Sequence, residues 1–149
     1  MTSTQRLKLE RFLRESPFVA FMGLELASFD PPAGTLALKM RLKPEFERSA
    51  GHTGRWHGGV VSALIDTAGD FALIMSHDVP PPTINIRIDY LRPITGQSIT
   101  ATATIRKTGR SVAFVDIDVV TENGTLVAIG RSNYATVGLQ TSPGKETGS

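Results

Sequence analysis

The chain has 149 residues, 16 lysines and arginines against 14 aspartates and glutamates, and no cysteine. This length predicts one domain with a sizeable core, and the lack of cysteine excludes disulfides, thiolate nucleophiles and cysteine-ligated metals. A net charge of only +2 argues against a nucleic-acid-binding protein. The apolar runs are too short to span a membrane and the polar N-terminus carries no secretory signal, so we expect a cytoplasmic protein with no membrane partner.

Residues 1–55 predict a helix followed by a β-hairpin and a loop. Apolar residues recur at helical spacing over 4–16, and Pro17 ends or interrupts this helix. Two alternating stretches, 23–29 and 35–42, flank a turn rich in proline and glycine and predict paired strands.

The stretch from Trp56 to Ser76 predicts a long helix that the rest of the chain encloses. Most of its helical wheel is apolar, which is typical of a helix buried nearly all round. One narrow stripe is small or polar: Gly59, Ser62, Ala63, Asp66, Gly69 and Asp70. Such a seam indicates that another backbone or a ligand approaches there, and an ionised Asp66 needs a hydrogen bond or a charged partner.

The last third of the chain predicts four strands. Three consecutive prolines after Val79 stop the helix, and the apolar pattern then alternates with period two over 84–91, 99–106, 115–119 and 126–137. Short connections favour an antiparallel sheet packed on the central helix, an α+β arrangement. The open edges of such a sheet predict an oligomer.

Several motifs in this order resemble the hotdog fold, and more narrowly the acyl-CoA thioesterases of the phenylacetate-degradation type within the 4-hydroxybenzoyl-CoA thioesterase superfamily. The resemblance covers roughly residues 20–138 and is carried by His57-Gly58-Gly59, Asp66, Thr83–Ile86, Tyr90-Leu91-Arg92-Pro93, Gly96, Thr108–Ser111 and Asn123-Gly124. It implies a curled antiparallel sheet of five to six strands around one long helix. The implied organisation is an N-terminal helical segment (1–22), a hotdog domain (23–138) and a disordered tail (139–149).

The resemblance also implies a thioester hydrolase that acts on an acyl-CoA as a homodimer or homotetramer. Its sites would lie at the dimer interface, with Asp66 from one subunit and the glycines from the other. The backbone N–H groups at a helix N-terminus can stabilise an oxyanion, and Gly58 and Gly59 let a carbonyl approach closely. Asp66 would act as a general base, which we favour, or as a nucleophile that forms an anhydride.

The remaining site residues have weaker signals. His57 is expected to cap the helix or orient the loop rather than transfer a proton. Thr83 matches a family position that orients the water, although strand alternation would turn it away from the apolar face of Ile84 unless the strand bends. The resemblance places the phosphates of coenzyme A, which is part of the substrate and not a cofactor, near one hairpin: Arg106, Lys107, Gly109, Arg110 and Ser111. A solvated hairpin end is the alternative, and the three histidines are not spaced as a metal site.

Two positions depart from the family pattern. Asp70 stands where relatives have a small residue, and we expect it to pair with an arginine across the interface or to be exposed, rather than to be a second acid. Upstream of the glycines, Gly51 replaces an Asn or Gln, so this role is vacant or passes to His52 or Ser49. The missing amide supports one alternative, a non-catalytic acyl-CoA-binding hotdog protein. The other alternative is a second enzyme class on the same fold, an enoyl-CoA hydratase or dehydratase that would use His57.

Overall fold

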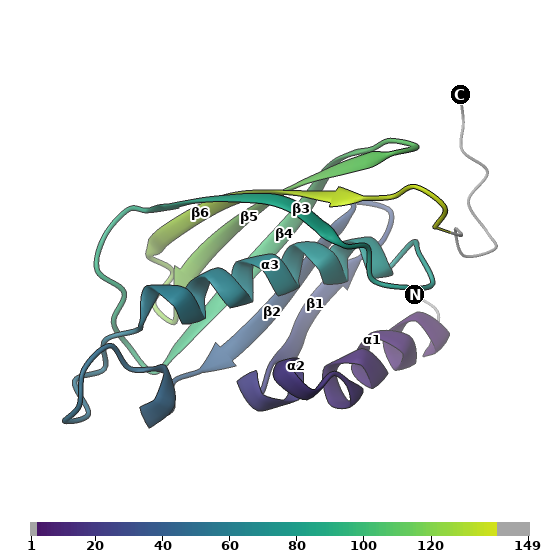
Figure 1. The fold of residues 1–149 in the computed structure, drawn as a ribbon. Helices are drawn as coiled ribbons and strands as arrows, with labels where there is room; N and C mark the ends of the chain where they lie inside the picture. Colours follow the sequence, from purple (N-terminus) through teal and green to yellow (C-terminus); the bar gives the residue numbers. More distant parts are fainter. Residues whose placement is uncertain (1–2, 140–149) are drawn as a thin grey trace.

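In the computed structural model, which describes residues 3–139, a six-stranded antiparallel sheet curls around the helix α3 (Figure 1). The strand order is β1-β2-β4-β5-β6-β3, so β1 and β3 form the two edges. The strands are β1 (Glu25–Asp30), β2 (Thr35–Arg41), β3 (Thr83–Tyr90), β4 (Ser98–Thr108), β5 (Val112–Thr121) and β6 (Leu126–Ala135). The predicted α+β architecture is therefore confirmed, with each strand in its expected place.

Helix α3 (Gly58–Ile74) supplies the centre of the core. Its apolar side chains are almost all inaccessible to solvent, among them Val61, Leu64, Ile65 and Leu73. The inward-facing residues of the strands, such as Val115 and Ile117, complete the core. At about 25 cal/mol per Å² of apolar surface, this burial is the main force that holds the sheet around the helix.

The N-terminal segment folds into two helices, α1 (Ser3–Glu15) and α2 (Pro17–Met22). Pro17 interrupts the helical segment and also begins α2, where a missing N–H costs nothing. Leu9 is fully buried, and the ring of Phe12 meets the ring of Phe71 edge to face with centroids 6.5 Å apart. These contacts attach α1 to the C-terminal half of α3.

A short 3₁₀ helix, η1 (Pro44–Phe46), precedes the loop that leads into α3. Residues 140–149, which hold nearly all of the predicted tail, lie outside the described residues. None of the helices within 3–139 is long and apolar enough to cross a bilayer.

Candidate active site

Asp66 lies in the middle of α3, where two hydroxyl groups hold its carboxylate and its backbone. Thr83 Oγ1 donates a hydrogen bond to Asp66 Oδ1 over 2.8 Å. Tyr134 Oη donates to the Asp66 carbonyl over 2.8 Å and lies 3.4 Å from Oδ1. Within residues 3–139, Asp66 Oδ2 accepts no hydrogen bond, so this oxygen is available to a water or a substrate.

A bulge at the start of β3 turns Thr83 toward Asp66. Thr83 pairs with Tyr134 and Asn85 pairs with Asn133, so Ile84 is one residue too many for the partner strand. A bulge shifts the alternation of side chains by one position. Thr83 therefore faces α3, and Ile84 is 57% exposed. The expectation that Ile84 is on the apolar face is wrong, because the strand bends there.

Tyr134, which the sequence did not identify, is the buried support of this site. The side chain is fully buried, and burial above all raises the pKa of its phenol, so the hydroxyl remains a donor. It fits because residue 69 is glycine: a Cβ there would lie 2.2 Å from Tyr134 Oη. The stripe of small and polar residues on α3 indicates that another group approaches the helix closely. It does not indicate which group, because Tyr134 lies 68 residues from Asp66 in the chain.

Asp70 is half-buried one turn beyond Asp66. The prediction that it is exposed is wrong: Asp70 Oδ1 is buried and has no hydrogen-bond partner within residues 3–139. The expected pairing with an arginine across an interface stays a prediction. Burial, with a smaller contribution from the charge on Asp66, raises the pKa of Asp70 to about 8. Asp70 is therefore a largely neutral acid at physiological pH.

The other end of α3 presents one free backbone donor. His57 is the N-cap, and its Nδ1 accepts the Gly59 N–H over 2.9 Å. This hydrogen bond uses the Gly59 donor and leaves the imidazole proton on Nε2 when the ring is neutral. The Gly58 N–H has no hydrogen-bond partner among the described residues, and the Tyr90 hydroxyl donates to the Gly58 carbonyl over 2.6 Å.

The carboxylate and the free N–H belong to one helix but cannot meet in one chain. Eight residues separate Gly58 from Asp66, which corresponds to about 12 Å along the helix axis. The oxyanion donor must lie about 3 Å from the carbonyl oxygen, and the general base must lie within hydrogen-bond reach, about 3 Å, of the water that attacks the same carbonyl. Asp66 and the Gly58 N–H of one chain are therefore too far apart to act on the same carbonyl.

A hollow of about 860 Å³ adjoins the Gly58 end of α3. It is lined by Arg48, Arg55, Trp56, His57, Gly58, Tyr90, Arg92, Pro93, Ile94 and Thr95. Trp56 both lines this hollow and packs in the core, where its ring stacks on Phe46 and its Nε1 donates to the Gly96 carbonyl.

The loop before the glycines is organised by Glu47. Its carboxylate accepts the Gly54 N–H over 2.7 Å and lies 3.9 Å from His52 Nδ1. His52 and Ser49 are exposed, and the described contacts bring neither of them to His57 or Gly58. The replacement for the usual upstream amide stays a prediction.

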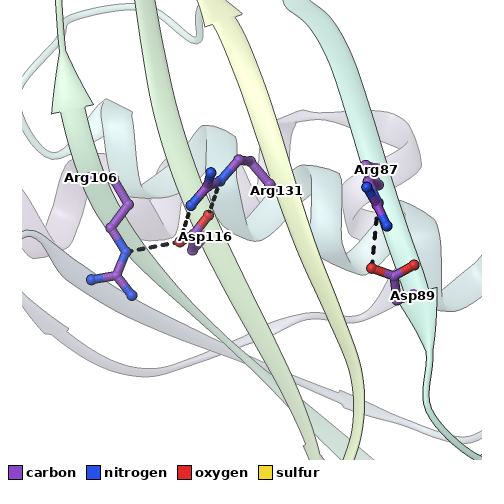
Figure 2. A network of polar contacts seen from close by, with 5 residues as sticks. All are labelled: Arg87, Asp89, Arg106, Asp116 and Arg131. Atoms are coloured by element: carbon purple, nitrogen blue, oxygen red, sulfur yellow. Dashed lines mark hydrogen bonds and ion pairs between the residues drawn. The ribbon is translucent and has the colours of Figure 1, made fainter.

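The β4–β5 hairpin, which was predicted to bind coenzyme A, lies at the opposite end of the molecule from the N-terminal end of α3 (Figure 1). The turn Gly109–Ser111 is fixed by Thr136, which donates to the carbonyls of Gly109 and Ser111. Lys107 and Arg110 are exposed. Arg106 is paired: its Nε lies 2.9 Å from an Asp116 oxygen, and Arg131 approaches the same carboxylate (Figure 2).

The Arg106–Asp116–Arg131 network lies on the sheet face opposite α3 (Figure 2). Arg131, and then Arg106, hold the pKa of the Asp116 carboxyl below its ordinary value. A second pair, Arg87 and Asp89, lies on β3. These side chains mainly neutralise one another, which does not single out Arg106 as a phosphate ligand.

Comparison with known proteins decides the family. The family model of the thioesterase superfamily matches residues 53–128, which include the His57 cap, both glycines, Asp66 and Thr83. The chain belongs to this superfamily. The predicted resemblance to hotdog thioesterases is thus confirmed.

Individual relatives agree over nearly the whole chain. The medium/long-chain acyl-CoA thioesterase YigI of Escherichia coli is 28% identical, over 90% of this chain and 96% of its own. Human acyl-coenzyme A thioesterase 13 is 27% identical over 88% and 93% of the two chains. The structure of a mutant phenylacetic acid degradation protein PaaI from Thermus thermophilus is 26% identical, with a TM-score of 0.69 over 81% of this chain and 99% of that one.

Proposed function

We propose that this chain is an acyl-CoA thioesterase whose active site is completed by a second copy of itself. The observation that carries the proposal is the separation of the two half-sites on α3. Asp66, oriented by Thr83, can activate a water, whereas the free N–H of Gly58 can stabilise an oxyanion. The two groups can act on one thioester only if they come from different chains.

The edge strand β3 supports a two-fold dimer that would bring the half-sites together. Within residues 3–139, β3 pairs only with β6. Its exposed apolar side chains include Ile84 and Tyr90, and the exposed Leu91 follows directly after the strand. Thr83 at one end is bonded to Asp66, and Tyr90 at the other end is bonded to Gly58. Antiparallel pairing of two β3 strands would set each end against the opposite end of its copy.

The chemistry then follows from the groups present. Asp66 Oδ2 takes a proton from a water held beside Thr83, and the water oxygen adds to the thioester carbonyl. The negative charge that develops on the carbonyl oxygen is stabilised by the Gly58 N–H of the second copy and by the positive end of its helix. The tetrahedral intermediate collapses as the C–S bond breaks, and the proton held by Asp66 passes to the leaving thiolate. The products are the carboxylic acid and the thiol of coenzyme A.

Direct attack by Asp66, with an anhydride intermediate, is the alternative route to the same products. A single turnover in H₂¹⁸O separates the two routes. A water nucleophile puts ¹⁸O into the first equivalent of acid and none into Asp66, whereas an anhydride that water opens at the Asp66 carbonyl carbon delivers an ¹⁶O of Asp66 to the acid and leaves ¹⁸O in the Asp66 carboxylate. We expect ¹⁸O in the acid, because Thr83 and the bound backbone fix the carboxylate in one orientation.

The test of the activity is a panel of aryl- and fatty-acyl-CoA esters assayed for release of free thiol. The names of the bacterial and human relatives support acyl-CoA esters as the class, with medium and long chains first. Asp66→Asn should lower kcat by a factor of about 10³. The matched control is Asp118→Asn, an exposed carboxylate on β5, which should retain wild-type turnover.

Other outcomes of the panel identify the alternatives. Binding of the esters without turnover of any would indicate a non-catalytic acyl-CoA-binding protein. Hydration of an enoyl-CoA would indicate a hydratase. This second outcome is disfavoured by His57, whose Nδ1 is already occupied by the Gly59 N–H.

A further inference from the structure

The first turn of α3 contains two glycines in succession, and the peptide group between them is held at both ends. The Gly58 carbonyl accepts a hydrogen bond from the Tyr90 hydroxyl over 2.6 Å, and the Gly59 N–H donates to His57 Nδ1 over 2.9 Å. We call this Gly58–Gly59 peptide group the clamped peptide. Consecutive glycines give a backbone the greatest conformational freedom, and helix ends fray. The two hydrogen bonds therefore fix a turn whose own sequence leaves it flexible.

Tyr90 is the side chain that ties this turn to the sheet. The other side-chain hydrogen bonds of the two glycines are local, because His57 caps Gly59 and Ser62 Oγ donates to the Gly59 carbonyl. Among residues 3–139, Tyr90 supplies the one side-chain hydrogen bond that reaches the two glycines from another element. Its ring also lies against the helix, since a Cβ added at Gly58 would lie 3.4 Å from the ring and the hydroxyl.

Strand β3 directs Tyr90 to this turn by the alternation of its side chains. Ile86 and Ile88 are partly buried and pack against the core. Tyr90 is the next alternate residue, so its side chain lies on the same face of the strand. The bulge at Ile84 brings Thr83 onto this face as well. Both ends of one edge strand therefore contact α3, Thr83 at the carboxylate and Tyr90 at the first turn.

The clamped peptide directly follows the proposed oxyanion donor. The Gly58 N–H has no hydrogen-bond partner within residues 3–139, and the carbonyl of the same residue is the one that Tyr90 holds. Any rotation of the clamped peptide moves the Gly58 Cα and changes the direction of this N–H. An oxyanion donor is effective when it is fixed in advance about 3 Å from the developing charge, and a misplacement of about 1 Å costs about a hundredfold in rate.

We propose that Tyr90 is a positioning residue for the oxyanion donor: its hydroxyl fixes the clamped peptide and thereby directs the Gly58 N–H of its own chain at the thioester carbonyl. This proposal rests on the proposed thioesterase function, in which that carbonyl is attacked by a water held at Asp66 of the second copy. Strand β3 then positions both reacting groups of its chain. Thr83 orients Asp66 in one active site, and Tyr90 orients Gly58 in the other.

Tyr90→Phe is the variant that tests the proposal, because it retains the ring against Gly58 and removes only the hydroxyl. With decanoyl-CoA as substrate, we expect kcat to fall by about tenfold or more. KM should change little, because the lost interaction is made in the transition state. A wild-type kcat in Tyr90→Phe, or a loss found in KM alone, would overturn the proposal.

Mixed dimers of differently tagged chains show which half of the active site the hydroxyl serves. An Asp66→Asn chain paired with a Tyr90→Phe chain keeps one complete site and should retain about half of wild-type turnover. A chain with both changes, paired with a wild-type chain, has no complete site and should be slower by a further factor of about ten or more.

Thr83→Val in place of Tyr90→Phe is the matched control for the mixed dimers. It should reverse the order of the two arrangements, since Thr83 bonds to Asp66 of its own chain. Equal turnover of the two Tyr90→Phe arrangements would mean that the hydroxyl acts on the whole dimer, and the proposed role would be refuted.

Amide hydrogen exchange, measured by NMR, separates failure of this proposal from failure of the proposed function. If the wild type hydrolyses no thioester, the thioesterase proposal fails, but the clamped peptide is still measurable. The Gly59 N–H should exchange about tenfold or more faster in Tyr90→Phe than in the wild type, because its turn opens more often. The amide of Ile117, between two paired strands on β5, should keep its rate. An unchanged rate at Gly59, or an equal increase at both amides, would contradict the proposal.

Discussion

Thr83 donates a 2.8 Å hydrogen bond to the carboxylate of Asp66, from the first residue of an edge strand to the middle of the central helix. The contact exists because the bulge at Ile84 turns the hydroxyl inward. It fixes one oxygen of the carboxylate, whereas the other accepts no hydrogen bond from the part of the chain that the structure describes. Thr83 is therefore a positioning residue for Asp66 in the proposed reaction.

Removal of the Thr83 hydroxyl should slow the chemical step. We expect Thr83→Val, which keeps the shape of the side chain, to lower kcat by about tenfold to a hundredfold, because Asp66 loses its orienting donor. Thr83→Ser keeps the hydroxyl and should stay within a few-fold of wild type. Steady-state kinetics with one acyl-CoA check this, and equal activity of the valine and serine variants would remove Thr83 from the mechanism.

The cap formed by His57 predicts a structural role for this residue. His57→Asn retains a side-chain acceptor for the Gly59 N–H, so it should keep most of the stability and activity. His57→Ala should lose about 1 kcal/mol of unfolding free energy. Denaturant unfolding and thiol-release assays measure both effects. A kcat that falls by several powers of ten in the asparagine variant would instead indicate proton transfer by His57.

Asp70 predicts a pH-dependent stability. Its pKa is about 8 in the folded protein against an ordinary value of 3.8, so the folded state binds more protons between these two values. Stability therefore decreases as pH rises through this window, and the full penalty is reached above pH 8. Asp70→Asn removes the titrating group, so its melting temperature should exceed that of the wild type by several degrees at pH 9.

The advantage of Asp70→Asn should shrink as the pH is lowered to 5. Thermal melts of the two proteins at pH 5, 7 and 9 give the comparison. A difference in melting temperature that is independent of pH would mean that Asp70 is ionised or neutral in both folded and unfolded states alike. Asp118→Asn, an exposed site on β5, should show no such trend.

The fold could be predicted from the sequence because its signals are local. The apolar residues around the helical wheel of 56–76 predict the buried helix to within two residues at each end. The alternating apolar patterns predict the strands of the sheet. The motif from His57 to Asp66 identified the family, and a cap at His57 follows from its place before two glycines.

The parts of the site that could not be predicted depend on long-range contacts. The bulge at Ile84 is a property of how β3 pairs with β6, and regular alternation contains no sign of it. Tyr134 reaches Asp66 from the last strand, through a space that exists only because Gly69 lacks a side chain. The exposure of Asp70 could not be predicted from the helix alone, because its burial is decided by the sheet that closes over α3.

The pairing of charges also could not be predicted from the sequence. Arg106 and its neighbours formed an obvious basic cluster along the chain, but Asp116 on the adjacent strand pairs with Arg106. Arg48, Arg55 and Arg92 are scattered in the sequence, and only the fold gathers them around one hollow. Proximity in the chain is a poor guide to which positive charges remain free.

The proposal that one active site uses two chains is tested most directly by subunit complementation. Gly58→Pro removes the proposed oxyanion donor at the first helical position, where proline is tolerated, and the extended backbone of His57 suits a following proline. Gly58→Ala, which keeps the N–H, is its control. Gly58→Pro and Asp66→Asn homodimers should both be inactive.

The decisive measurement is the turnover of dimers formed when Gly58→Pro and Asp66→Asn chains are co-expressed with different tags. A mixed dimer holds one site with an intact Gly58 from one chain and an intact Asp66 from the other. We predict that a random mixture recovers about one quarter of wild-type activity, and the purified mixed dimer about one half. A purified mixed dimer as inactive as its parents would contradict the shared site.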